Sequence, residues 1–165
     1  MVYDPITSQV ARDIVASFNG MPITYNGETK IIYATRQRMT RKIASRVPFV
    51  EVAGPWIDVD ERDNRCNEMD LKFAIEFIDY EIDDSDEENS QSISEISDLI
   101  LAQLNVMLML NYQRNGLALS TKIMEMGHVF SGDTQDTEFT AYMNISVKIF
   151  VNADNPDTLA APSYS

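Results

Sequence analysis

The alternation of apolar and polar residues in the last quarter of the chain constrains its fold more than any other feature. Apolar residues occupy every second position there: Phe139, Ala141, Met143, Ile145, Val147, Ile149 and Val151. The residues between them are mostly polar, and side chains along a strand point alternately to the two faces of its sheet. We therefore expect a long strand over 137–151 that is buried on one face and needs neighbouring strands.

A tight hairpin is predicted near the N-terminus. Asn26-Gly27 lies between two β-prone runs, and the favoured two-residue hairpin turn requires positive φ at both central residues. Residues 23–25 should pair with 28–33. We expect this hairpin to project as an edge element, with Tyr25 and Tyr33 available to a partner.

Three more strands and a loop are predicted between the hairpin and the last strand. The strand at 47–52 should end at the Gly54-Pro55 turn, and the polar residues 58–67 should form a loop. Alternation over 69–82 predicts a central strand covered on both faces. Residues 122–130 should pair with 137–151 as the closing hairpin.

Two helices are predicted. Asp4-Pro5 is a start signal and Asn19-Gly20 a stop signal for the first. Ser92 and Glu95 have capping-box spacing at the start of the second, over 92–115. Its apolar stripe comprises Ile93, Ile96, Leu99, Ile100, Leu104, Met107, Leu108 and Leu110. We expect a core that buries Phe73, Ile75, Phe77, Leu99, Leu104, Ile145 and Val147 together.

These elements predict an α+β fold, with a mainly antiparallel or mixed sheet and two packed helices. At 165 residues, the chain should form one domain over 1–152, followed by a C-terminal tail, 153–165, that is flexible or docked on a neighbour. The single cysteine, Cys66, excludes an intrachain disulfide and fits a reducing compartment. We expect no signal peptide and no membrane span.

Charge is unevenly distributed along a chain whose net charge is −13. Such a chain repels phosphates, so specific nucleic-acid binding is not expected. A basic stretch and an acidic stretch are candidate interfaces between subunits: Arg36, Arg38, Arg41, Lys42 and Arg46, and Asp83, Asp84, Asp86, Glu87 and Glu88. Separate solvated faces are the alternative. The conformation of 35–46 stays open between an arm, a loop and a short helix.

The sequence contains no phosphate-binding glycine motif and no nucleophile elbow. His128 is the only histidine, so it is interpreted as a packing or surface residue, and a Cys66–His128 catalytic pair is only a weak alternative. The acidic stretch lacks the glycine and glutamate positions of an EF-hand. We therefore predict no catalytic residue, cofactor or metal site, and hence no enzyme. The Met107–Leu110 stretch is either core or a pliable binding surface.

Order and pattern together resemble the tail terminator (tail-completion) proteins of tailed bacteriophages. The resemblance covers about residues 5–151 and rests on three features. These are the strand 47–52 with its Gly54-Pro55 turn, the strand 69–82 followed by an acidic loop and the helix 93–115, and the closing hairpin from Lys122 to Ile149.

The resemblance implies a virion protein, assembled in the host cytoplasm, whose hexameric ring caps the tail tube and joins it to the head. Its partners would be further copies of itself, the tail tube protein and a head-completion or neck protein. Genomic DNA would pass through the ring without specific binding. Alternatives are a head-completion, neck or tube protein, or, from a different class, an acidic module that mimics DNA.

Overall fold

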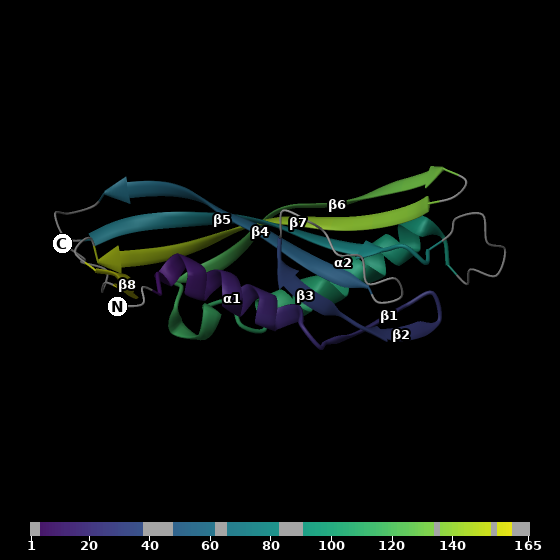
Figure 1. Cartoon of the computed structure of the whole chain (residues 1–165), viewed down its shortest axis with the longest axis horizontal. Helices are drawn as coiled ribbons and strands as arrows, with labels where there is room; N and C mark the ends of the chain where they lie inside the picture. The colour runs from purple at the N-terminus through teal and green to yellow at the C-terminus, as the bar shows by residue number, and fades with distance from the viewer. Residues whose placement is uncertain are drawn as a thin grey trace.

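The computed structural model describes residues 4–37, 48–61, 66–82, 91–133, 136–152 and 155–159. It has the predicted α+β fold, with both helices of the described residues on one face of a long twisted sheet (Figure 1). The elements follow in the order α1 (Ile6–Phe18), β1 (Pro22–Tyr25), β2 (Glu28–Ile31), β3 (Tyr33–Arg36), β4 (Phe49–Glu61), β5 (Cys66–Asp79), α2 (Ile93–Met109), a 3-10 turn (Arg114–Gly116), β6 (Ser120–Asp133), β7 (Asp136–Asn152) and β8 (Asn155–Leu159).

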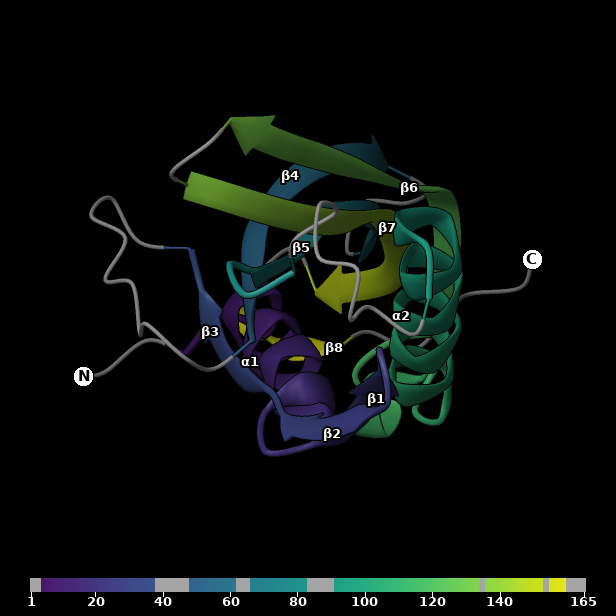
Figure 2. The same cartoon turned by 90° about the vertical axis from the view of Figure 1, so that its right-hand side faces the viewer.

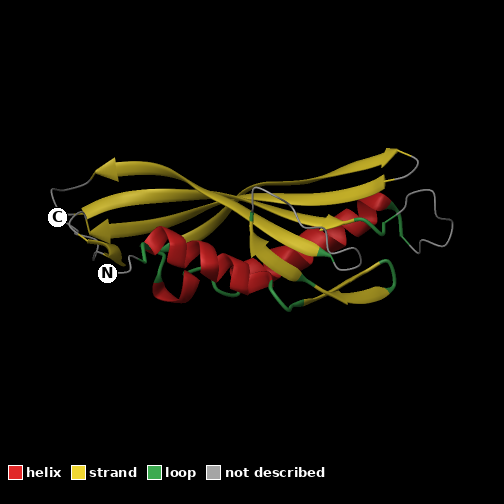
Figure 3. Ribbon diagram, in the orientation of Figure 1, coloured by secondary structure: helices red, strands yellow, loops and turns green. Residues whose placement is uncertain are grey.

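The main sheet has the strand order β3-β4-β5-β7-β6, and β8 pairs with β7 off this path. β3 is parallel to β4 and every other pairing is antiparallel, so the sheet is mixed, as predicted. β1 and β2 form a separate two-stranded sheet. Figure 3 shows this small sheet lying apart from the main one. β3 and β6 are therefore the two outer strands of the main path.

β7 confirms the strand predicted from the alternation. It pairs with β5 on one side and β6 on the other. All seven of its alternating apolar side chains are buried. The intervening residues from Thr140 to Lys148 are only partly covered, because the helices lie on the other face.

β4 and β5 differ from the prediction. β4 continues through Gly54-Pro55 instead of ending there, and a register shift between Ala53 and Trp56 accommodates one extra residue as a bulge. Gly54 makes the bulge possible because it adopts φ of +111°. The loop predicted over 58–67 is wrong in its described parts, which belong to β4 and β5. Pairing between the ends of these two strands prevails there over the local polarity of the sequence. Over its middle, β5 is covered on one face only.

The core between sheet and helices is largely the predicted one. Phe73, Ile75, Phe77, Leu104, Ile145 and Val147 are all buried. The hydroxyl of Ser92 accepts a hydrogen bond from the backbone of Glu95 at 3.3 Å, which confirms the predicted start of α2. Leu99, however, is 38% exposed and Leu110 76% exposed. The apolar stripe of α2 is wider than the face that the sheet covers.

The predicted hairpin forms, with φ of 53° at Asn26 and 77° at Gly27. The prediction that Tyr25 is available to a partner is wrong, because its side chain packs edge-on against the ring of Phe77 and is 2% exposed. Tyr33 belongs to β3 and is 52% exposed. Within the segment expected to be a tail, β8 folds back on the end of β7.

Candidate interaction surface

Of the ten charged residues predicted to form interfaces between subunits, Arg36 alone lies within the described residues. Arg38, Arg41, Lys42, Arg46 and the five acidic residues Asp83, Asp84, Asp86, Glu87 and Glu88 lie outside them. Arg36 ends β3, and its guanidinium donates a hydrogen bond to the carbonyl of Gly54 at 3.1 Å. With Arg12 it lines an open groove of about 510 Å³ between α1 and β3.

The start of β4, which follows the basic stretch in sequence, lies beside the end of β5, which precedes the acidic stretch. Phe49 at the start of β4 is paired with Ile78 near the end of β5. The rings of Phe49 and Tyr80 are 6.0 Å apart. The described residues that follow the basic stretch and precede the acidic stretch are therefore neighbours.

A polar cluster joins the hairpin to the end of β5. The ammonium of Lys30 lies 3.2 Å from carboxylate oxygens of both Asp79 and Glu81, and the Tyr25 hydroxyl donates to Asp79. Burial and the neighbouring Asp79 carboxylate raise the pKa of Tyr25. Burial alone would lower the pKa of Lys30, but Asp79 and Glu81 outweigh it and raise that pKa. This cluster anchors the hairpin.

Two glutamine side chains form hydrogen bonds with backbone groups of the hairpin. The amide of Gln103 accepts from the Thr24 N–H at 2.9 Å and donates to the Thr24 carbonyl at 2.7 Å. Gln91 accepts from the Asn26 N–H at 2.8 Å. Because α2 supplies Gln103, the hairpin is held to the helix and β1 is not open for strand pairing at Thr24.

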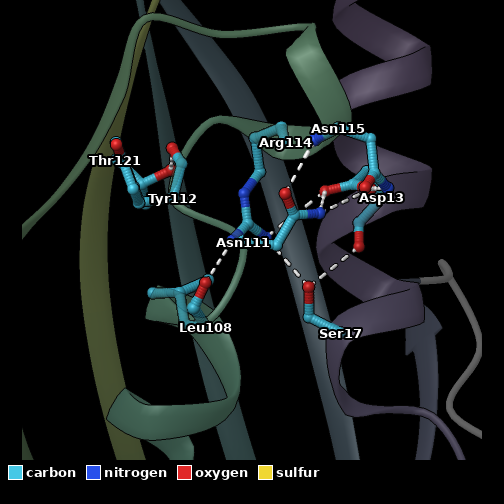
Figure 4. A network of polar contacts seen from close by, with 8 residues as sticks. All are labelled: Asp13, Ser17, Leu108, Asn111, Tyr112, Arg114, Asn115 and Thr121. Atoms are coloured by element: carbon cyan, nitrogen blue, oxygen red, sulfur yellow. Dashed lines mark hydrogen bonds and ion pairs between the residues drawn. The ribbon is translucent and has the colours of Figure 1, made fainter.

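A buried arginine holds the end of α2 to α1 (Figure 4). The Arg114 side chain is fully buried, lies 3.4 Å from the Asp13 carboxylate, and donates to Ser17 at 2.9 Å and to the Leu108 carbonyl. Burial lowers the pKa of Arg114, and Asp13 partly offsets that effect. Asn115 donates to the same carboxylate at 2.7 Å. This network fixes the helices relative to each other.

The largest group of exposed apolar side chains lies on α2, on β6 and on the connection between them. We call it the α2–β6 surface. Nine of the thirteen large apolar residues exposed in the described chain belong to it. They are Leu99, Val106, Met109, Leu110, Tyr112, Leu119, Met124, Met126 and Val129. Soluble monomers rarely expose so many apolar side chains together, and such patches mark interaction sites.

The α2–β6 surface has one part on α2 and one on β6, joined by the connection that carries Tyr112 and Leu119. Val129 pairs with Thr140 of β7 and therefore lies on the sheet face away from the helices. The chain turns between them, and α2 packs under the β6–β7 half of the sheet (Figure 2). Leu99, Val106 and Leu110 recur at helical spacing on the outer side of α2. Of the Met107–Leu110 stretch, Met107 and Leu108 are core, while Met109 and Leu110 are exposed. The first two residues of the stretch therefore belong to the core, and the last two belong to the exposed surface.

One stretch of the described chain, Ile93–Gly116, is long and apolar enough to cross a membrane by length and composition, with 33% of its most apolar window buried. The prediction of no membrane span did not anticipate an apolar stretch of this length. A core helix that packs against a sheet meets the criterion too, so the finding alone is weak evidence for a membrane protein. It does show how much apolar surface α2 presents.

The weak Cys66–His128 alternative is excluded by strand register. Cys66 is paired with Asn152 and His128 with Ala141, eleven positions away along β7. At about 3.3 Å per residue, these positions are roughly 36 Å apart. The His128 ring stacks on Phe139, with centroids 6.0 Å apart. No group of three or more metal-binding side chains occurs within the described ranges.

The opposite edge of the sheet also carries exposed apolar residues. We call the outer side of β3, with the adjoining Ile31, the β3 edge; Ile31 is 54% exposed and Tyr33 52% exposed. The sequence predicted the exposure of Tyr33 and allowed a binding surface at Met107–Leu110, but it did not predict the rest of either surface. Two features of the sequence could have indicated the α2–β6 surface. The helix α2 has apolar residues on a second side, and the segment 124–129 has apolar residues on both faces, which is typical of an uncovered edge strand.

The chain matches no family model and no curated protein sequence.

Proposed function

We propose that this protein is a structural subunit that acts by assembly, as the tail terminator of a tailed bacteriophage. The observation that carries assembly is the α2–β6 surface, whose nine exposed apolar side chains favour a protein partner over solvent. The terminator role comes from the resemblance in element order given above. The mixed sheet with two helices on one face is compatible with that resemblance.

In this proposal, copies of the chain close into a ring at the end of the tail tube, stop its growth and accept the head. A closed ring needs two different complementary patches on each subunit. The net charge of −13 per chain favours passage of DNA over adhesion. The tail tube protein and a neck protein would bind the two faces of the ring.

The test is electron microscopy of particles made without this protein. We expect filled heads lacking tails, together with tails of unregulated length, and restoration of joined particles by the wild-type gene. Filled heads attached to tails of normal length would contradict the proposal. Tails of normal length that fail to join heads would instead favour a neck or head-completion protein.

A second experiment addresses the basic stretch. Reversing Arg38, Arg41 and Arg46 to glutamate should preserve folding but prevent joining, if the stretch contacts an acidic surface of another subunit. The control is Lys72→Glu, because Lys72 is exposed and pairs with Asp58 at 2.6 Å within the same chain. Joined particles from the triple variant would show that the stretch has no role in assembly.

A further inference from the structure

We propose that the α2–β6 surface of one subunit binds the β3 edge of a second copy of this chain, head to tail. The inference deepens the proposed function, on which it rests, by naming the two surfaces that meet. It starts from topology: β6 and β3 are the opposite outer strands of one sheet. A second copy placed with β3 beside β6 continues that sheet across the subunit boundary.

The helix layer continues in the same way. α1 packs under β3 and β4, and α2 packs under β6 and β7, on the same face of the sheet (Figure 1). Extending the sheet therefore brings α1 of the second copy beside α2 of the first. The exposed residue Val106 would then lie near the groove between α1 and β3, whose apolar lining includes Val15, Ala16 and Ala34. Leu99 lies instead beside the hairpin of its own chain, where it lines a groove with Thr24 and Gly27.

β3 keeps backbone groups directed outward. The N–H groups of Tyr33 and Gln37 point inward, to the carbonyls of Pro48 and Val52 on the β4 side. Ala34 and Arg36 therefore direct theirs to the outer edge. The Asn19 side chain accepts the Ala34 N–H at 3.0 Å. Ahead of β3, Ile32 is already bonded to Gly20 and Met21. Among the described residues of the outer edge, the Arg36 N–H and the Ala34 carbonyl remain for hydrogen bonds to a second copy.

Charge selects head-to-tail docking over self-docking of two α2–β6 surfaces. Three exposed carboxylates, those of Glu95, Asp98 and Glu125, and one exposed cation, Lys122, lie on α2 and β6, so this surface is acidic on balance. On the groove beside β3, Asp4 neutralises Arg12 at 2.5 Å, whereas Arg36 bonds only a carbonyl and keeps its charge. Two α2–β6 surfaces facing each other would oppose like charges, and the β3 edge offers a cation instead.

The test measures association of purified full-length chains by sedimentation velocity across a concentration series. Val106→Glu places a charge in the α2–β6 surface, and Tyr33→Glu places one at the β3 edge. Ile57→Glu is the matched control, because Ile57 is 46% exposed on β4 outside both surfaces. Thermal unfolding establishes that each variant folds.

We expect the wild type and Ile57→Glu to associate alike, and each of the other two variants to associate about tenfold more weakly or worse, because a charge buried in an interface lacks a partner. An equimolar mixture of Val106→Glu and Tyr33→Glu should form heterodimers and nothing larger, since each variant keeps one intact surface.

Three results would overturn the inference. They are a wild type that stays monomeric at the highest concentration reached, a Tyr33→Glu variant that associates like the wild type, and a mixture that forms no heterodimer. The second result would indicate self-docking through α2 and β6. The sedimentation assay contains no virion component, so a negative result there does not contradict the proposed role in tail joining. Conversely, a failure of that role in the microscopy experiment does not contradict binding between the α2–β6 surface and the β3 edge.

Discussion

The side chain of Tyr142 on β7 covers Gly127 on the neighbouring strand β6. A Cβ atom at position 127 would come within 2.5 Å of the Tyr142 hydroxyl oxygen and 2.7 Å of the ring carbon that bears it. The two residues are directly paired in the register, on the sheet face away from the helices. The ring thus shields a backbone position that has no side chain of its own.

Gly127→Ala should therefore destabilise the wild type by about 1 kcal/mol, because the Tyr142 ring must rotate away. In a Tyr142→Ala background the same change should be neutral or stabilising, because alanine restricts the unfolded chain more than glycine. Chemical denaturation of the four proteins in this double-mutant cycle measures the coupling. Equal costs in both backgrounds would show that the ring does not constrain residue 127.

Alkaline pH should weaken the hairpin anchor. The folded-state pKa values of Tyr25 and Lys30 are raised above their ordinary values of 10.0 and 10.5. Both groups therefore contribute stability that is complete below about pH 10 and is lost as pH rises beyond it. Tyr25→Phe should lower stability at pH 7, because buried Asp79 loses a donor, and should flatten the alkaline decline. Urea titrations from pH 7 to 11 measure both, and an unchanged slope would contradict the assignment.

Leu104 and Leu99 lie on one helix but should differ in cost. Leu104 is fully buried, so Leu104→Ala should lower the free energy of unfolding by roughly 2–5 kcal/mol. Leu99 is 38% exposed, so Leu99→Ala should cost the monomer less than about 1.5 kcal/mol. Urea denaturation at low protein concentration compares them. A similar loss from both variants would mean that Leu99 belongs to the core.

Arg114 should contribute more to stability than an exposed arginine. Arg114→Ala leaves the Asp13 carboxylate, which is 9% exposed, without its cation, and should cost about 3–5 kcal/mol. Arg12→Ala is the control, because the Arg12–Asp4 pair is more than half exposed on both sides and should contribute less than about 1 kcal/mol. Thermal unfolding of both variants provides the comparison. Similar values would show that burial adds nothing to the Arg114 contact.

Periodicity predicted the elements whose environment is uniform along their length. β7 is covered mainly on one face from Phe139 to Lys148, so its alternation was sufficient, and Asn26-Gly27 fixed the hairpin by local geometry. Prediction from the sequence failed where strand pairing in the folded protein prevails over local signals. Gly54-Pro55 is a bulge inside β4 because β5 continues to pair beyond it. The sequence shows that Leu99 and Leu110 are apolar, but only the position of the sheet shows which side of α2 stays uncovered.

The length of β7 has a mechanical consequence. Its 17 residues are paired along most of their length with β5 and β6, and these strands run along the long axis of the molecule in Figure 1. A pull along that axis loads the cross-strand hydrogen bonds in shear, so many must break together, whereas a pull across it would open them one at a time. The subunit is therefore expected to be stiff under tension along its strands and weak under peeling from the β6 side.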